Sequence, residues 1–390
     1  MSLSPTDITL CIDPFSYHFE RDQLFGADSA RGLGADTMNA PYLHLRDWFA
    51  ERGVRVHTAD RLMRGEVGGK RNIVMSFGLR GRYHALGRRD DVVLSTFFAF
   101  ESPVVDPKLY RAFPDIARHF KRLYSFSDAD SLVPVVGQRV EMLHFEIPYP
   151  IDRIRDDLFD RTERKFLVVI NHNKLPPLYW NELYTERMRA VEFFARTKDI
   201  DLYGKAWEGP AFLMGIPPWV PGRIQHAHRW MRKQWQRVRP DPLLVAARTV
   251  YRGFVPDKLA TLGEYTFSLC FENVVVNGWI TEKLFDCFVT GTIPIFLGAP
   301  DVKDYVPREC FIDMRDFANY EELRKFLKAV SPSEIARYKE AMRAYMASES
   351  FKRFGNQRFT ELIGRLVEED SGVSLGARPS PRPVTGGRVS

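Results

Sequence analysis

The pattern of apolar and polar positions divides the first half of the chain into alternating strands and helices. Short apolar runs predict strands, and segments with apolar residues at helical spacing predict helices. The predicted strands are Ile8–Asp13, 54–60, 72–79, 91–101 and 121–128, and the predicted helices are 40–53 and 107–120, the second broken by a proline. This alternation is typical of a parallel sheet with helices on its faces.

The second half begins the same alternation again. Residues 165–171 form a continuous apolar run, which is typical of a strand covered on both faces. The further predicted strands are 201–204, 266–271, 293–300 and 310–314, and the predicted helices are 181–196, 256–265, one from about 281, 319–330, 331–347 and 357–369. We expect Asp257 near the N-cap of the helix over 256–265.

The two series of elements predict an α/β protein with two Rossmann-like domains that face a cleft. A chain of 390 residues suits two domains better than one core. The charged, proline-containing stretch 144–165 is typical of a linker. The predicted parts are an N-terminal Rossmann-like domain 1–155, a C-terminal Rossmann-like domain 156–350, a C-terminal helix 351–370 and a disordered tail 371–390.

Composition narrows the classes of partner. The formal net charge of +6 favours anionic small molecules or a membrane surface slightly, and we expect no nucleic-acid partner. The N-terminus lacks the features of a secretory signal, and no apolar run is long enough to span a bilayer. We expect a cytoplasmic location, with peripheral contact at the inner membrane as an option. The four cysteines lie in apolar segments and are expected to be buried thiols.

The stretch 267–300 carries the most specific chemistry. It predicts a buried strand, a polar loop, a short helix with Thr281 at its N-cap and a second buried strand. A helix N-terminus binds anions, and Lys283 in the first turn is unfavourable there unless an anion is bound. Glu282 could accept hydrogen bonds from the vicinal hydroxyls of a ribose. The alternative is a solvated pair of charges on an amphipathic helix.

This stretch, FSLCFENVVVNGWITEKLFDCFVTGTIPIFLGAP, closely resembles the donor-binding motif of the α-1,3-fucosyltransferases, glycosyltransferase family 10. The matching parts are Phe271-Glu272-Asn273, Thr281-Glu282-Lys283 and the strand that ends at Pro300. The similarity covers the second half well and the first half in patches. It implies the GT-B architecture, GDP-fucose as donor and inversion of the anomeric centre.

The resemblance also implies roles for single residues. Arg248 and Lys283 should neutralise the diphosphate, and Glu282 should hold the ribose. Glu101, at the end of the strand 91–101, should be the general base that takes the proton of the acceptor hydroxyl. The other donor-side candidates are Asn273, Trp279, Lys258 and Arg252.

The implied acceptor is a surface glycan, either an oligosaccharide or a lipid-linked one, with O3 of GlcNAc or glucose as the expected hydroxyl. No metal or other cofactor should be required, because side-chain cations and a helix N-terminus can stabilise the leaving diphosphate, although a divalent cation could stimulate. Asp128-Ala129-Asp130 resembles a metal-binding D-x-D, but a turn with two solvated carboxylates is the favoured interpretation.

Two other functions stay open at this stage, and a third is disfavoured. The same fold and mechanism could use a different nucleotide sugar, or the chain could bind a nucleotide without catalysis. A nicotinamide-dependent oxidoreductase is disfavoured, because the glycines between Gly78 and Gly87 lack the G-x-G-x-x-G spacing.

The segment 209–242 departs from the family pattern. Between residues 223 and 239 it has six basic side chains, no acidic one, and Trp230 and Trp235. Basic and aromatic residues at helical spacing indicate either an interfacial helix that contacts a membrane through 223–239 or an inserted surface helix.

Overall fold

The structure is a computed structural model, which describes residues 3–26, 39–215, 220–239 and 241–376. It forms two compact units. The first unit comprises 1–98, 116–123 and 356–390, and the second comprises 99–115 and 124–355. The sequence predicted one crossing of the chain near residue 155, whereas the chain crosses between the units several times.

The first sheet is parallel and six-stranded. Its order is β2-β1-β3-β4-β5-β6, and β1 pairs with β2 on one side and with β3 on the other. The strands are β1 Ile8–Asp13, β2 Arg55–Thr58, β3 Arg71–Ser76, β4 Val92–Ala99, β5 Arg122–Ser125 and β6 Leu143–His144. The reversal of strand order between β1 and β3 makes the sheet doubly wound, as the sequence predicted.

The second sheet is also parallel, with the order β13-β12-β11-β7-β9. Its strands are β7 Lys165–Ile170, β9 Ile200–Tyr203, β11 Tyr265–Phe271, β12 Ile293–Leu297 and β13 Ile312–Asp313. A separate pair joins β8 Lys174–Leu175 to β10 Phe212–Leu213. The strand order reverses between β7 and β11, which is the position where doubly wound sheets bind ligands.

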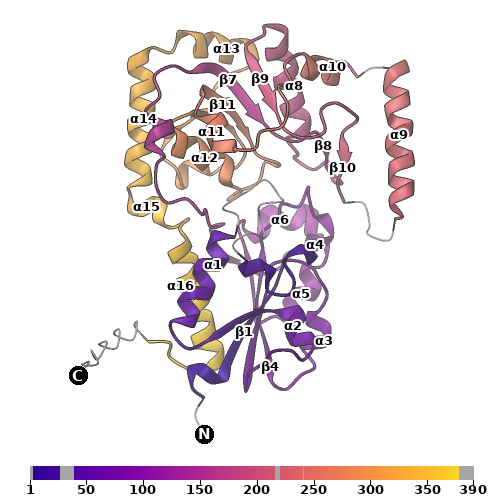
Figure 1. The fold of residues 1–390 in the computed structure, drawn as a ribbon, viewed down its shortest axis with the longest axis vertical. Coiled ribbons are helices and arrows are strands. Elements are labelled where there is room, and N and C mark those ends of the chain that lie inside the picture. The colour runs from indigo at the N-terminus through magenta and orange to yellow at the C-terminus, as the bar shows by residue number, and fades with distance from the viewer. Residues whose placement is uncertain (1–2, 27–38, 216–219, 240, 377–390) are drawn as a thin grey trace, which may run out of the picture. The chain divides into compact units, whose positions relative to one another are not determined.

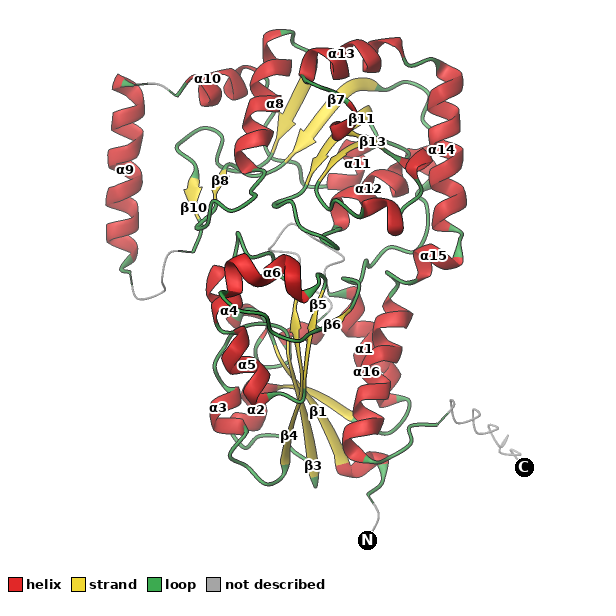
Figure 2. Ribbon diagram, turned by 180° about the vertical axis from the view of Figure 1, so that it is seen from behind, coloured by secondary structure: helices red, strands yellow, loops and turns green. Residues whose placement is uncertain are grey.

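Helices cover these sheets, and the ribbon views show their arrangement within each unit (Figure 1, Figure 2). The helices up to residue 160 are α1 Ala40–Ala50, α2 Ala59–Met63, α3 Tyr83–Leu86, α4 Pro107–Arg111, α5 Phe113–His119, α6 Ala129–Val136 and α7 Asp156–Phe159. The later helices are α8 Tyr184–Arg196, α9 Gly222–Val238, α10 Pro242–Thr249, α11 Lys258–Leu262, α12 Glu282–Thr290, α13 Tyr320–Ala329, α14 Pro332–Met346, α15 Glu349–Lys352 and α16 Asn356–Ser371.

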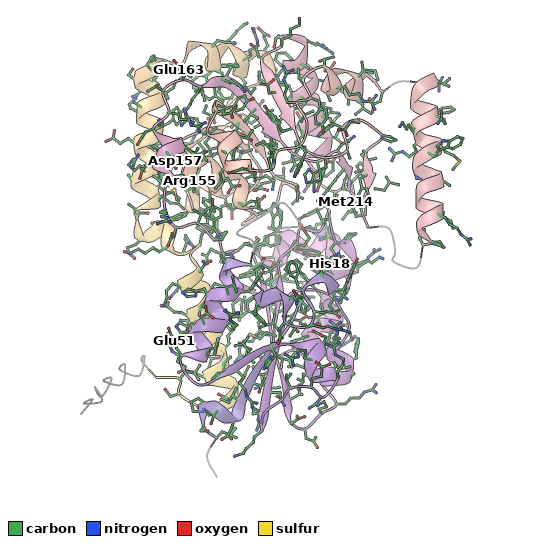
Figure 3. All side chains as sticks on the ribbon, in the orientation of Figure 1. His18, Glu51, Arg155, Asp157, Glu163 and Met214 are labelled. Atoms are coloured by element: carbon green, nitrogen blue, oxygen red, sulfur yellow. The ribbon has the colours of Figure 1, made fainter. Side chains whose placement is uncertain are left out.

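The expected linker 144–165 is not a free connection. Tyr149 is buried, and its hydroxyl donates to Asp286 Oδ1 at 2.8 Å. The short helix α7 buries Leu158 and Phe159, while the ion pair of Arg155 and Asp157, labelled in Figure 3, stays exposed. These buried apolar residues attach the stretch to the second unit, although most of their neighbours in the sequence are charged.

The C-terminal helix belongs to the first unit. In both ribbon views α16 lies beside α1, and it also contacts β3 (Figure 1, Figure 2). Asp370 accepts from Lys121 Nζ at 2.9 Å and from Arg122 Nη1 at 3.0 Å. The expected tail begins later than residue 371, because Val373 and Leu375 are buried; residues 377–390 lie outside the described part.

Two expectations about the chain's chemistry are met. All four cysteines are free and buried. Within the described residues, none of the helices has the length and hydropathy that a bilayer crossing requires.

Candidate active site

The candidate site lies where the strand order of the second sheet reverses. β7 and β11 are neighbours, so their carboxyl ends deliver the residues after 170 and after 271 to the same edge of the sheet. The loop after β11 then leads into α12, whose N-terminus lies at the same edge. A pocket there is lined by strand and helix residues, among them Asn171, Arg187, Lys258, Cys270 and Lys283.

A buried carboxylate organises the start of α12. Glu272 directly follows β11 and is fully buried. Its carboxylate accepts from the backbone N–H of Thr281 at 3.0 Å, from the Thr281 hydroxyl at 2.7 Å and from Lys283 Nζ at 3.0 Å. Thr281 is the N-cap residue, as predicted, but its hydroxyl makes this contact and no capping hydrogen bond.

The adjacent Glu282 and Lys283 lie near each other, with Lys283 Nζ 3.6 Å from Glu282 Oε1, and each also has a partner of its own. Lys283 turns inward to Glu272, whereas the side chain of Glu282 is 52% exposed and lies 3.8 Å from Lys258 Nζ. Partial desolvation raises the pKa of Glu282, but the charges of Lys283 and Lys258 outweigh this effect and lower that pKa to about 2. Lys258 itself pairs with Asp286 at 2.6 Å. Glu282 is thus a permanently ionised acceptor at the helix N-terminus.

Further positively charged side chains lie near Lys283 at the start of α12. Burial lowers the pKa of Lys174, the positive charges of Lys283 and Arg187 lower it further, and Glu101 opposes them. Burial also lowers the pKa of Arg187. The positive charge of Arg187 lowers the pKa of Lys283, but the negative charge of Glu272 raises it more, so the pKa of Lys283 is raised overall. We call Lys174, Arg187, Lys258 and Lys283 the cationic cluster. Carboxylates already compensate Lys258 and Lys283, whereas the pKa of Lys174 is lowered, so an anion such as a diphosphate would stabilise the charged form of Lys174.

Sequence reasoning missed two members of the cationic cluster, and one local signal was available. Lys174 follows the predicted strand 165–171 within the polar run His172-Asn173-Lys174. Burial and the neighbouring lysines Lys174 and Lys205 lower the pKa of His172 to about 4, so its imidazole is neutral. Arg187 lies on α8, and nothing in the helical pattern distinguishes it from a surface arginine.

Two expected donor residues, Asn273 and Trp279, contact side chains of the same unit, and their role toward the donor stays a prediction. The Asn273 side chain accepts from Arg187 Nη2 at 2.9 Å, and Arg187 Nε donates to the Phe271 carbonyl at 3.0 Å. Trp279 is buried, and its ring centroid lies 4.5 Å from that of Phe126. Its indole nitrogen has no hydrogen-bond partner among the residues that the structure describes. A buried indole N–H without an acceptor is a donor that a bound ligand could satisfy.

The two expected arginines contact other residues of the second unit. Arg248, in the last turn of α10, donates to the carbonyls of Trp207 at 3.1 Å and Glu208 at 3.3 Å. Arg252 pairs with Asp201 at 2.6 Å and is 52% exposed. Both guanidinium groups are held by the protein, and their assignment to the diphosphate stays a prediction.

Glu101 follows β4 and belongs to the second unit. Its carboxylate accepts from the backbone N–H of Ser102 at 2.8 Å, and its own carbonyl accepts from the Tyr110 hydroxyl at 2.6 Å. Burial raises the pKa of the Glu101 carboxyl, while the hydrogen bond from Ser102 and the charge of Lys283 oppose this rise. The structure thus brings Glu101 within electrostatic reach of Lys283.

The D-x-D stretch is a helix cap. Asp128 accepts from the backbone N–H of Ser131 at 2.8 Å at the start of α6, and Asp130 pairs with Arg139 at 2.9 Å. Both residues line a cavity of about 400 Å³, together with Asn277 and Asp301. The favoured interpretation, a turn rather than a metal site, agrees with these contacts. The expectation that no metal is required stays a prediction.

Comparison with known proteins agrees with the sequence motif. Residues 248–360 match the family model "Glycosyltransferase family 10 (fucosyltransferase) C-term". The α-(1,3)-fucosyltransferase FucT of Helicobacter pylori is 41% identical over 75 residues, which cover 19% of this chain and 16% of that protein. The α-(1,4)-fucosyltransferase of Arabidopsis thaliana is 36% identical over 116 residues, which cover 28% of each protein. The matches thus span less than a third of these relatives.

A solved structure supports the fold along nearly the whole chain. An alpha-glucosyltransferase in complex with UDP and a 13-mer DNA has a TM-score of 0.53 and 13% identity, and the superposition covers 92% of this chain and 99% of that one. The two doubly wound parallel sheets are therefore those of a GT-B protein. The similarity concerns the fold and carries no argument about the donor.

Proposed function

We propose, from the family 10 domain over residues 248–360 and the side chains that it brings together, that the chain transfers fucose from GDP-fucose to a glycan hydroxyl. The observation that carries the proposal is the cationic cluster at the point of strand reversal, with the carboxylate of Glu101 within reach of its charge. The names of the matched relatives support fucose as the sugar.

In this proposal the donor's diphosphate lies against Lys283 and Lys174 at the N-terminus of α12. Glu282, ionised and exposed, holds the ribose hydroxyls, and Arg248 supplies a further positive charge. These groups stabilise the negative charge that the diphosphate gains as its bond to the sugar breaks. These residues can therefore stabilise the departing GDP themselves, and the proposal includes no step on a metal ion.

Glu101 acts as the general base. As the acceptor oxygen forms its bond to the anomeric carbon, its proton passes to the Glu101 carboxylate, and GDP departs with the electron pair of the broken bond. A base with a raised pKa is a stronger acceptor for that proton than an ordinary glutamate. The expected inversion of configuration stays a prediction. NMR can test it, by measuring the anomeric coupling constant of the first product.

The test is a transfer assay with GDP-fucose against a panel of oligosaccharide and lipid-linked glycan acceptors. The proposal expects product with GDP-fucose and little with UDP-sugars or with other GDP-sugars. Transfer from another nucleotide sugar alone would favour the first alternative, a related transferase with a different donor. Tight GDP binding without any transfer or donor hydrolysis would favour a noncatalytic binding protein.

A further inference from the structure

The helix α9 exposes an unusual amount of apolar surface. Twelve large apolar residues are exposed among those that the structure describes, and five of them lie on this one helix: Ile224, Trp230, Met231, Trp235 and Val238. Trp235 is 62% exposed and Val238 is 80% exposed. Single exposed apolar residues need no explanation, but a group on one helix marks an interaction surface.

Four of these residues form one stripe. At about 100° per residue, Ile224, Met231, Trp235 and Val238 fall within an arc of about 60°. The helix has 17 residues and is therefore about 25 Å long. In both ribbon views α9 stands at the outer edge of the second unit (Figure 1, Figure 2). Arg232 Nη1 on this helix donates to the Ala211 carbonyl at 3.0 Å.

The charge of the helix points to the occupant. Residues 222–239 include six arginines or lysines and no aspartate or glutamate. Lys233 is exposed and lies on the side of the helix opposite the stripe, and the Arg239 guanidinium lies 5.9 Å from the centre of the Trp235 ring. A stripe of tryptophan and aliphatic residues on a helix whose charged residues are all basic is the pattern of helices that lie in the interface of an anionic membrane.

A coiled coil with a second copy fits the pattern less well. With Ile224, Met231 and Val238 at the a positions, the d positions are Ala227 and Gln234. A small and a polar residue there give a weak seam. We propose that the stripe of α9 inserts into the headgroup region of an anionic lipid surface and holds the second unit there.

The test is sedimentation of the full chain with phosphatidylcholine vesicles, with and without phosphatidylglycerol, at low and high salt. Wild-type protein should bind the anionic vesicles at low salt and bind them at least tenfold more weakly at high salt. Met231→Ser with Trp235→Ser should lose binding by tenfold or more. Lys233→Gln with Arg239→Gln should weaken it and flatten its salt dependence.

Tyr179→Ser is the matched control, because Tyr179 belongs to the same unit and is 65% exposed, but lies off the helix. It should bind vesicles like the wild type, and all variants should keep the wild-type melting temperature. No binding to anionic vesicles at low salt, or equal binding by the Met231 and Trp235 double variant, overturns the proposal. A concentration-dependent dimer that the double variant abolishes would assign the stripe to a second copy instead.

Discussion

At the residue scale, Lys283 has two roles, which a second substitution at Glu272 can separate. It compensates the fully buried Glu272, and the proposal also gives it a place against the diphosphate. Removing one partner of a buried ion pair costs about 3–5 kcal/mol. Lys283→Met alone should therefore lower the free energy of unfolding by that order and reduce transfer.

Adding Glu272→Gln to Lys283→Met should restore most of the stability, because no buried charge is then left unpaired. Transfer should stay about a hundredfold below wild type, since the diphosphate has still lost a cation. Urea unfolding and initial rates of transfer measure the two effects. A double variant that regains both stability and wild-type transfer would make Lys283 purely structural.

Glu101 makes a prediction about pH. A base works when it is ionised, and burial raises the pKa of Glu101 above its ordinary value of 4.5. The kcat/KM of transfer should therefore fall as the pH drops through this raised pKa. Glu101→Gln should lower transfer by about a hundredfold or more, remove that pH dependence and leave GDP affinity unchanged.

Asp128→Asn is the matched control for Glu101→Gln. It removes a carboxylate, but the side-chain oxygen can still cap α6, so transfer should stay within a few-fold of wild type. Loss of transfer in the Asp128 variant together with persistence in the Glu101 variant would move the base to Asp128.

At the scale of elements, the local sequence predicted most of the structure. β1 has the predicted bounds, and the Asp257 side chain caps α11 by accepting from Ala260 N–H at 2.9 Å. The predicted helix 107–120 is broken, but at Ala112, and Pro114 is the second residue of α5. These features depend on neighbours within a few residues. The packing of α7 depends on residues more than a hundred positions away, and the role of Glu272 depends on its burial. No local sequence pattern displays either.

The loop between β11 and α12 carries a prediction of its own. Gly278 has φ +73°, and an added Cβ would lie 1.9 Å from the Phe126 carbonyl oxygen. Gly278→Ala should therefore cost clearly more than the roughly 1–2 kcal/mol of the left-handed conformation alone. Gly137, with φ +90° and nothing within 4 Å of an added Cβ, belongs to the same unit and isolates the conformational part.

Thermal unfolding of the Gly278→Ala and Gly137→Ala variants measures the difference. The first should melt several degrees below the second and should also transfer more slowly, because the loop positions Thr281 and Lys283. Equal melting temperatures would show that the loop can relax away from Phe126 without cost.

At the scale of the whole molecule, the C-terminal segment tests the division into units. α16 buries Phe359, Ile363, Leu366 and Val367 in the first unit, and each such side chain contributes roughly 1.5–3 kcal/mol. A chain that ends at Gly355 should therefore lose the cooperative unfolding of the first unit in calorimetry. A chain that ends at Gly376 should unfold like the full chain, and similar behaviour of the two truncations would refute this assignment.

The domain boundaries could not have been predicted from the sequence alone. The motif over residues 267–300 indicated the family 10 similarity of the second unit, because its residues are adjacent in the chain. The return of α16 to the first unit is a non-local event, and the apolar face of that helix would suit either unit. The acceptor side is likewise unspecified by any contiguous motif.

The most direct measurement is calorimetric titration of the full chain with GDP and with UDP. The account predicts that GDP binds at least tenfold more tightly than UDP, and that the Lys283→Met, Glu272→Gln double variant loses most of the GDP affinity while it remains folded. Equal or tighter binding of UDP, or unchanged GDP affinity in the folded double variant, would contradict the assignment of this site to a guanine-nucleotide sugar.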